Sequence, residues 1–220
     1  MTNYPFILIT MGIVLMGLWI SNILYDLNVP QYISRKVGHA AGGMAFWISL
    51  YVFKEAYIPI TLCAGFCLLL WSSRFLYPKA FRGVGGSGRS DNVMAEVWFP
   101  LSAIPVLAVG WWWLKRPELA ITALLFMGWG DMLTGIVRSQ IYGKAVKGFW
   151  GSAAMFLVCL LLSWAFVIPF WIGAVASLVA TVTEWACGDV GILKKVDDNM
   201  AIPITSAATL LILSYLAGVL

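Results

Sequence analysis

The sequence predicts an all-α protein, a polytopic integral membrane helical bundle of about eight transmembrane helices. Two features of its composition lead to this prediction: 61% of the 220 residues are hydrophobic, and only 11% are charged. An ordinary soluble domain carries about 25% charged residues. The third observation is that the apolar residues gather into long stretches, and a helix that crosses a bilayer needs roughly 20 of them.

Eight such stretches follow one another along the chain. The predicted spans cover residues 5–24, 37–53, 57–77, 95–114, 118–137, 149–168, 169–187 and 200–219. Only the neighbourhood of Pro169 separates the sixth from the seventh, and proline there predicts a turn because it interrupts helices. A bundle of seven spans is the alternative. We expect residues 1–220 to form one transmembrane domain, since the short loops leave no room for a separate soluble module.

The basic residues are distributed unevenly between the two sets of loops. Eleven of the fourteen Lys and Arg residues fall on one side of the predicted bundle, and three fall on the other. Cytoplasmic loops carry the excess of Lys and Arg, so we expect the eleven to face the cytoplasm and both termini to lie outside, in an inner, plasma or endoplasmic-type membrane. Topology and anionic lipid alone would also explain a basic face. The eleven are Arg35, Lys36, Arg74, Lys79, Arg82, Arg89, Arg138, Lys144, Lys147, Lys194 and Lys195.

Three carboxylates lie within the predicted spans. Glu96 opens the fourth span, Asp131 lies in the last two turns of the fifth, and Glu184 lies in the last turn of the seventh. An acidic side chain costs about 2.5–3.5 kcal/mol at mid-bilayer on insertion scales, so each one needs a reason. Without a functional role, each carboxylate would either reach the membrane interface or pair with a basic residue of a loop. Because all three are expected at one depth beside the basic face, we favour a functional role.

One face of the fifth predicted span carries side chains that suit binding or catalysis. Asp131, Gly135 and Arg138 are spaced by four and three residues, so they share one side of a helix. Gly135 lets a neighbouring backbone or a ligand approach closely, because it has no Cβ atom.

The loop that follows predicts a phosphate site. Lys144 and Lys147 precede the sixth span, whose first turn, with Gly151 and Ser152, offers free backbone N–H groups. Lysines and the positive end of a helix dipole both attract phosphate. A carboxylate nearby suits a Mg²⁺ ion that bridges phosphate oxygens. The alternative is a glycine-containing turn with lysines that only set the topology.

Two basic segments add candidates for anion binding. His39 follows Arg35 by four residues, so the two share a helical face beside Lys36, where the imidazole would bind phosphate, move a proton or only form a hydrogen bond. The loop over residues 83–88 contains a G-x-G-x-x-G pattern, but no strand precedes it, which excludes a dinucleotide-binding fold. That loop either closes over an anion with Arg89 or serves as a linker.

The segment before the last span offers oxygen ligands. Asp197, Asp198 and Asn199 carry the hard oxygen atoms that Mg²⁺ prefers. Asp and Asn are also common at the start of a helix, where they cap free N–H groups. Together with Glu184, the segment would bind a metal or a ribose.

Taken in order, these motifs resemble the CTP-dependent polyprenol kinase family, which includes dolichol kinase, phytol kinase and the fungal-type diacylglycerol kinase. The resemblance covers about residues 32–205. Three positions differ from the family pattern: Gly148 and Trp150 stand where Ser and Glu are common, and Thr134 stands where Ala is common. The matching residues are Arg35, Lys36, His39, Gly130, Asp131, Gly135, Gly143, Lys144, Lys147, Gly151, Ser152, Thr183, Glu184, Asp198, Asn199, Ile202 and Pro203.

The resemblance implies transfer of the γ-phosphate of CTP to the hydroxyl group of a membrane lipid alcohol, with Mg²⁺ as cofactor. We expect Asp131, His39 and Glu96 to be catalytic, and Asp131, Asp197 and Asp198 to bind the metal. Glu96 and Asp197 are candidates because of their places in the sequence and are not among the residues that match the family. The other site residues would bind substrate or nucleotide: Arg35, Lys36, Arg89, Gly135, Arg138, Lys144, Lys147, Gly151, Ser152, Glu184 and Asn199.

Two other functions remain open on the sequence. A membrane CDP-lipid synthase also uses CTP and Mg²⁺ but releases pyrophosphate, and the Lys194-Lys195-x-Asp197 segment partly matches its pattern. A transporter for an anionic lipid or metabolite would place charges at the bilayer midplane. The partners we expect are the bilayer, a lipid alcohol and a nucleoside triphosphate, with no nucleic acid. Self-association is left open.

Overall fold

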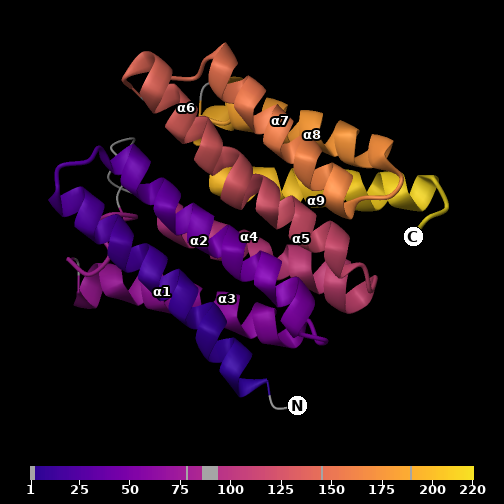
Figure 1. Ribbon diagram of the computed structural model, residues 1–220, viewed down its shortest axis with the longest axis horizontal. Helices are drawn as coiled ribbons and strands as arrows, with labels where there is room; N and C mark the ends of the chain where they lie inside the picture. Colours follow the sequence, from indigo (N-terminus) through magenta and orange to yellow (C-terminus); the bar gives the residue numbers. More distant parts are fainter. Residues whose placement is uncertain (1–2, 78, 86–93, 145, 189) are drawn as a thin grey trace.

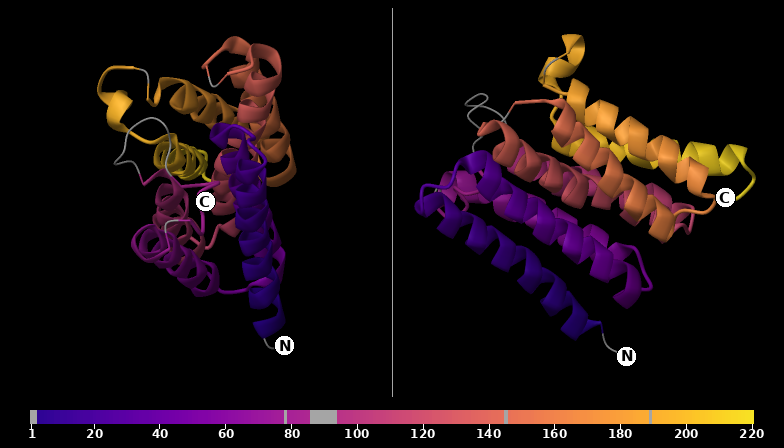
Figure 2. Two further views of the ribbon diagram at one scale, coloured as in Figure 1. Left: turned by 90° about the vertical axis from the view of Figure 1, so that its left-hand side faces the viewer. Right: turned by 45° about the horizontal axis from the view of Figure 1, so that its top comes forward.

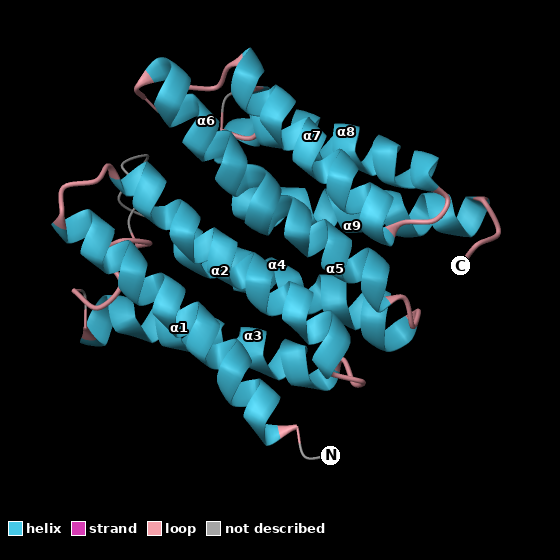
Figure 3. Ribbon diagram, viewed as in Figure 1, coloured by secondary structure: helices cyan, strands magenta, loops and turns pink. Residues whose placement is uncertain are grey.

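The computed structural model describes residues 3–77, 79–85, 94–144, 146–188 and 190–220, and all regular structure in these ranges is helical (Figure 3). The elements in chain order are α1 (Tyr4–Asp26), α2 (Gln31–Val52), α3 (Tyr57–Leu76), α4 (Ala95–Leu107), η1 (Ala108–Trp113), α5 (Pro117–Leu125), η2 (Phe126–Asp131), α6 (Met132–Tyr142), α7 (Phe149–Phe166), α8 (Phe170–Ala186), η3 (Gly191–Lys195) and α9 (Asp198–Leu216).

The helices form rods that coincide with the predicted spans. The π-helical segment η1 continues α4, and η2 joins α5 to α6 into one rod. Six rods of the described chain are long and apolar enough to cross a membrane, and α8, with 17 residues, is a shorter apolar helix. Helix α2, which contains the predicted span 37–53, is not among the six, because its first turns carry Arg35, Lys36 and His39. The chain is therefore an all-α, multi-pass integral membrane bundle, as predicted. The break near Pro169 is also confirmed, because α7 ends before it and α8 begins just after it.

Each rod runs antiparallel to the one before it, so the connections gather at two ends of the bundle (Figures 1 and 2). The connections after α1, α3, α6 and α8 meet at one end, and both termini lie at the other (Figure 1). The first end, with the connections 27–30, 77–94, 143–148 and 187–197, carries the predicted excess of Lys and Arg and is called the basic end below.

The rod made of α5, η2 and α6 is the centre of the bundle. Within its apolar window, 72% of the residues are buried, against 22% for α1 and for α3. It packs against α2, α7 and α9. A helix that is covered on all sides is apolar all round, which explains why residues 119–127 are apolar except for Thr122, whose hydroxyl group donates to the Glu118 carbonyl of its own helix.

Two glycines bring the central rod close to α2. A Cβ atom on Gly128 of η2 would lie 2.8 Å from the Cα atom of Gly43 on α2, so only glycine permits this crossing. π-Helical segments are rare and often occur at functional sites. Here η2 ends at Asp131, and the crossing directs this residue toward the first turns of α2.

One predicted position along a helix is wrong. The helix that carries Asp131 continues to Tyr142, past the predicted end of the span at residue 137. Asp131 thus precedes the whole 11-residue α6, or about 16 Å of helix, instead of lying in the last two turns. Glu184 does lie in the last turn of α8, and Glu96 in the first turn of α4, as predicted.

Candidate functional site

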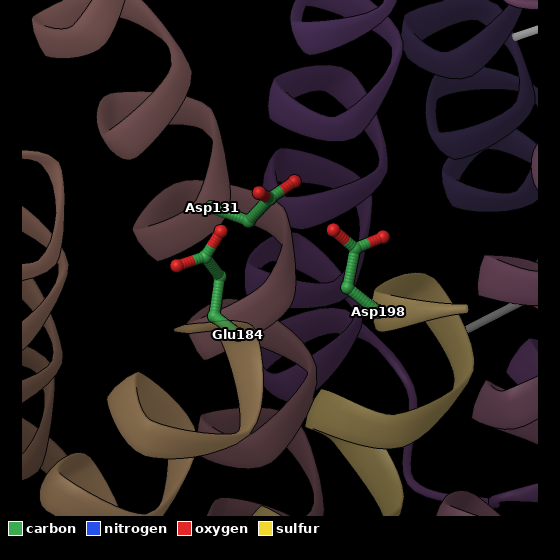
Figure 4. Close-up of side chains that lie close together, drawn as sticks. All are labelled: Asp131, Glu184 and Asp198. Atoms are coloured by element: carbon green, nitrogen blue, oxygen red, sulfur yellow. The ribbon is translucent and has the colours of Figure 1, made fainter. Parts of the chain in front are cut away.

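Three carboxylates from three rods converge inside the bundle (Figure 4). They are Asp131 at the end of η2, Glu184 in the last turn of α8, and Asp198 at the start of α9. One carboxylate oxygen of each lies within 4.8 Å of those of the other two. Asp131 and Glu184 are buried, and Asp198 is half-buried. We call these three residues the carboxylate cluster.

Asp131 is held by two basic side chains of α2. Its Oδ2 atom accepts a hydrogen bond from Nζ of Lys36 at 2.6 Å and lies 2.9 Å from Nδ1 of His39. Because a carboxylate oxygen can only accept, the contact places a proton on Nδ1 of the imidazole. The His39 ring is also fixed by an edge contact with Phe99, with ring centroids 5.7 Å apart. The orientation of Asp131 is therefore determined by α2.

Gly135 makes room for the lysine that holds Asp131. A Cβ atom at this position would lie 2.5 Å from Cε of Lys36. The sequence predicted that Gly135 admits a backbone or a ligand. In the structure its close neighbour is the Lys36 side chain, which crosses the helix at this point.

Glu184 forms a buried ion pair with Arg138 of α6. Both guanidinium NH groups donate to the carboxylate, at 2.7 Å and 2.9 Å. Such two-point pairs are among the strongest polar contacts in proteins. Gly151 of α7 allows this arrangement, since a Cβ atom there would lie 2.4 Å from Nε of Arg138.

Lys147 closes the C-terminal end of α8. Its Nζ atom donates to the backbone carbonyls of Glu184 at 2.6 Å and Trp185 at 3.2 Å, and also to that of Cys187. A positive charge is stabilised there by the free carbonyls and the negative end of the helix dipole. Lys147 thus supports the helix turn that carries Glu184.

Two other predicted residues lie near the α6–α7 connection. Lys144 is exposed in that connection. Ser152, in the first turn of α7, has a buried hydroxyl group without a hydrogen-bond partner in the described part of the chain. Arg89 lies outside the described residues.

The three residues Asp197, Asp198 and Asn199 at the start of α9 have three different roles. Asp197 caps the helix, because its Oδ1 atom accepts from the Asn199 backbone N–H at 2.9 Å. Burial, reinforced by the charge of Asp198, raises the pKa of Asp197 to about 7. Asn199 is buried and its side-chain amide donates to the Ala95 carbonyl at 2.7 Å. Of the three, only Asp198 belongs to the carboxylate cluster. Glu184, which the sequence placed with this segment as a metal or ribose ligand, also belongs to it.

Glu96 lies apart from the cluster. Its side chain is only 3% exposed, yet neither carboxylate oxygen has a hydrogen-bond partner among the described residues. The nearest cation is Arg74 of α3, whose Nε atom lies 3.3 Å from Oε1. Sequence reasoning counted Arg74 only as a topology-setting charge. The available signal was its place in the last turn of α3, across the connection from Glu96.

The carboxylate cluster fits a divalent cation. Lys36 and His39 both contact Oδ2 of Asp131, so Oδ1 has no hydrogen-bond partner within the described ranges. Asp198 accepts one backbone N–H through Oδ1, and its Oδ2 atom has no such partner there either. Carboxylate oxygens are the ligands that Mg²⁺ takes, usually one or two from the protein with the rest from water or phosphate. Asp131 and Asp198 would supply such a pair.

Comparisons with protein-family models, with curated protein sequences and with solved structures find no match for this chain. The family resemblance therefore depends on the motif residues alone. What those residues do in space is the independent observation: of the matching positions, Lys36, His39, Asp131, Glu184 and Asp198 all meet in or beside the carboxylate cluster. Arg138, which is not a matching position, joins them through its ion pair with Glu184.

Proposed function

We propose that this chain is a membrane lipid kinase that transfers the γ-phosphate of CTP, with Mg²⁺, to the hydroxyl group of a polyprenol-type lipid alcohol. The observation that carries the proposal is the convergence of three carboxylates with Lys36, His39 and Arg138. Phosphoryl transfer requires positioning, a cation and positive charge, with little covalent chemistry from the protein. CTP as the donor comes from the motif resemblance.

In this proposal the cluster is the phosphate end of the site. Asp131 and Asp198 would hold Mg²⁺, which when bound supplies positive charge to the nucleotide phosphates. Lys36 and Arg138 offset the charge of Asp131 and Glu184, so that the three carboxylates can lie together in a low-dielectric interior. The exposed Lys144 at the basic end would meet the incoming nucleotide.

Glu96 is the proposed acceptor of the alcohol proton. The new bond joins the alcohol oxygen to the γ-phosphorus, the bond from that phosphorus to the bridging oxygen breaks, and CDP leaves. Glu96 suits the role because its oxygens are buried and have no hydrogen-bond donor in the described chain. Two contacts connect the neighbours of Glu96 to the cluster: Asn199, next to Asp198, donates to the carbonyl of Ala95, and His39, which bonds to Asp131, lines the same cavity as Glu96.

The same proposal assigns the basic end to the cytoplasm, where CTP is available. The excess of Lys and Arg in short loops supports this orientation. Reporter fusions that are active on only one side of the membrane test it. A reporter that works only outside the cell should be active when it is fused to the C-terminus. A reporter that works only in the cytoplasm should be active when it is inserted after Gly143. The reverse pattern would contradict the orientation.

The activity is tested with detergent-purified protein, Mg²⁺, γ-labelled CTP or ATP, and a panel of lipid alcohols. We expect label in the lipid fraction and release of CDP. The Asp131→Asn variant should lose this activity. Asp26→Asn is its matched control, because it makes the same chemical change at an exposed position of the basic end. No labelled lipid with any alcohol would contradict the proposal.

A further inference from the structure

A polar pocket lies at the basic end, beside the apolar cavity between α1–α4. Its volume is about 260 Å³, against about 90 Å³ for the apolar cavity. Leu70 and Glu96 line both spaces, so these two residues lie between them. The pocket is bordered by the end of α1, the start of α2, α3, the start of α4 and part of the connection that follows α3. Its wall includes Tyr25, Gln31, Ser73, Arg74, Phe81 and Arg82.

The connection after α3 is fastened to α1 and α2 where it forms the pocket wall. Asn22 of α1 accepts the backbone N–H of Gly83 at 2.9 Å through its Oδ1 atom. Gln31 of α2 donates to the carbonyl of Arg82 at 2.9 Å and also to that of Gly85. The described part of the glycine-containing loop is therefore a fixed wall of the polar pocket.

The polar pocket contains charges of both signs. Arg82 lies 3.0 Å from the exposed Asp26, and Arg74 lies 3.3 Å from Glu96. The two cations are thus matched by two carboxylates, which favours a ligand without net charge. In the described part of the chain, Arg74 donates no hydrogen bond and the Glu96 oxygens accept none. A buried carboxylate in this state is costly, since it has lost water and gained no donor in return.

One oxygen of Glu96 is on the side of this pocket. A Cβ atom on Gly85, which lines the pocket, would lie 3.9 Å from Oε1 of Glu96. Oε1 is also the oxygen beside Arg74. A donor group in the pocket would therefore meet Oε1, and it does not require Oε2, which is left for the alcohol of the proposed reaction.

A ligand that fits these groups carries a hydrogen-bond donor for Glu96 and an anion for the two arginines. A phosphoethanolamine group has both, because its ammonium group donates and its phosphate oxygens accept from guanidinium groups. We propose that the polar pocket binds the head group of phosphatidylethanolamine, with the ammonium group at Glu96 and the phosphate at Arg74 and Arg82. Tyr25 and the basic connections belong to the level at which lipid head groups meet a membrane protein.

Phosphatidylcholine is the closest lipid for comparison. Its head group carries the same two charges but has no N–H group, so it leaves Glu96 without a hydrogen bond. The inference goes beyond the proposed function, and its test contains neither nucleotide nor alcohol. The outcome is therefore independent of phosphoryl transfer.

Binding is measured by native mass spectrometry of the detergent-purified full chain with phosphatidylethanolamine, phosphatidylcholine or phosphatidylglycerol of identical acyl chains. We expect the ethanolamine lipid to bind about tenfold more tightly than the choline lipid, which is the effect of one hydrogen bond to a charged group. Equal binding of these two lipids would overturn the inference. Preferred binding of phosphatidylglycerol would also overturn it, since general attraction of anionic lipid to the basic end would then suffice.

The same head group without acyl chains distinguishes a lipid from a soluble ligand. Glycerophosphoethanolamine should compete with the lipid for the pocket and bind more weakly than the lipid, because it lacks the apolar contacts of the chains. Lipid binding that this compound does not reduce would depend on the acyl chains, and the head-group site would be rejected. Tighter binding of glycerophosphoethanolamine than of the lipid would reject a membrane lipid as the ligand.

Two variants separate the two contacts. Glu96→Gln should abolish the preference for the ethanolamine lipid, because a neutral amide forms no ion pair with the ammonium group. Arg82→Gln should weaken the binding of both lipids about threefold to fivefold and keep the preference, as expected for one exposed charge. Lys79→Gln is the matched control, because it removes an exposed positive charge from the same connection outside the pocket, and it should bind normally. If Glu96→Gln and Arg82→Gln both fold and bind as the unmodified chain does, the inference is wrong.

Discussion

Asp131 and Glu96 are two carboxylates that the bundle buries equally and surrounds differently. The side chain of each is 3% exposed. Asp131 receives a hydrogen bond from Lys36 and another from His39, whereas among the described residues Glu96 has an ion-pair contact with Arg74 at 3.3 Å and no hydrogen bond. The first charge is compensated by the protein itself. Within the described part of the chain, the Glu96 oxygens accept no hydrogen bond, which is the state expected of a group that meets a ligand.

Replacing Asp131 should have the largest effect, because it removes both a cluster carboxylate and the partner of a buried lysine. We expect Asp131→Asn to lower turnover on the order of 10³-fold. It should also lower the free energy of unfolding by about 3–5 kcal/mol, since the Lys36 charge loses its partner. Turnover and the thermal unfolding midpoint in detergent measure the two effects. Normal values for both would contradict the role of Asp131.

Replacing Glu96 should separate activity from stability. Glu96→Gln removes the proposed proton acceptor, so turnover should fall about 10²-fold. The unfolding midpoint should stay the same or rise, because the variant no longer buries a carboxylate without hydrogen bonds. A large loss of stability with unchanged turnover would mean that Glu96 stabilises the fold through its contact with Arg74 and takes no part in the reaction.

Displacing Lys36 without changing any charge tests the geometry of the cluster. In Gly135→Ala, the new methyl group would lie 2.5 Å from Cε of Lys36, so the lysine must move. Misplacement on this scale should cost between about tenfold and 10²-fold in turnover. Gly65→Ala is the control, because nothing lies within 4 Å of its Cβ position. Equal turnover of the two variants would show that the Lys36 position is unimportant.

The smallest effect is expected at the exposed basic end. Lys144→Ala removes one solvent-exposed positive charge. We expect the KM for nucleotide to rise a few-fold at low ionic strength and the difference to shrink at high salt, where exposed charges are screened. Turnover at saturating nucleotide should stay unchanged. A loss of turnover that persists in high salt would place Lys144 inside the site.

Most of the rods were predictable because they depend on long local stretches of apolar residues, α2 being the exception. The end of the rod that carries Asp131 was not, because helix α6 continues past the apolar stretch as a polar segment, 138–142, and ends only where Gly143 adopts a left-handed conformation with φ of 63°. The distance of Asp131 from the end of its helix therefore depends on Gly143.

The site was predictable in its residues and not in its pairings. Spacing along a helix indicates which side chains share a face, but the Arg138–Glu184 pair and the Arg74–Glu96 contact join different rods. The same reason explains why Glu184 belongs to the carboxylate cluster and Asp197 does not. Asp197 bonds to its own helix start, a local contact, while Glu184 reaches the cluster only through the packing of α8 against its neighbours. The cavity between α1–α4 likewise exists only after packing.

The most direct test of the central claim follows the two ends of the CTP triphosphate in parallel. Detergent-purified protein with Mg²⁺ and geranylgeraniol is given CTP labelled at the γ-phosphate in one reaction and at the α-phosphate in the other. The proposed kinase predicts lipid label only from the γ-position, with CDP released, and loss of that label in Asp131→Asn but not in Asp26→Asn. Lipid label from the α-position with pyrophosphate released, using a phosphatidate acceptor, would identify a cytidylyltransferase and contradict the account.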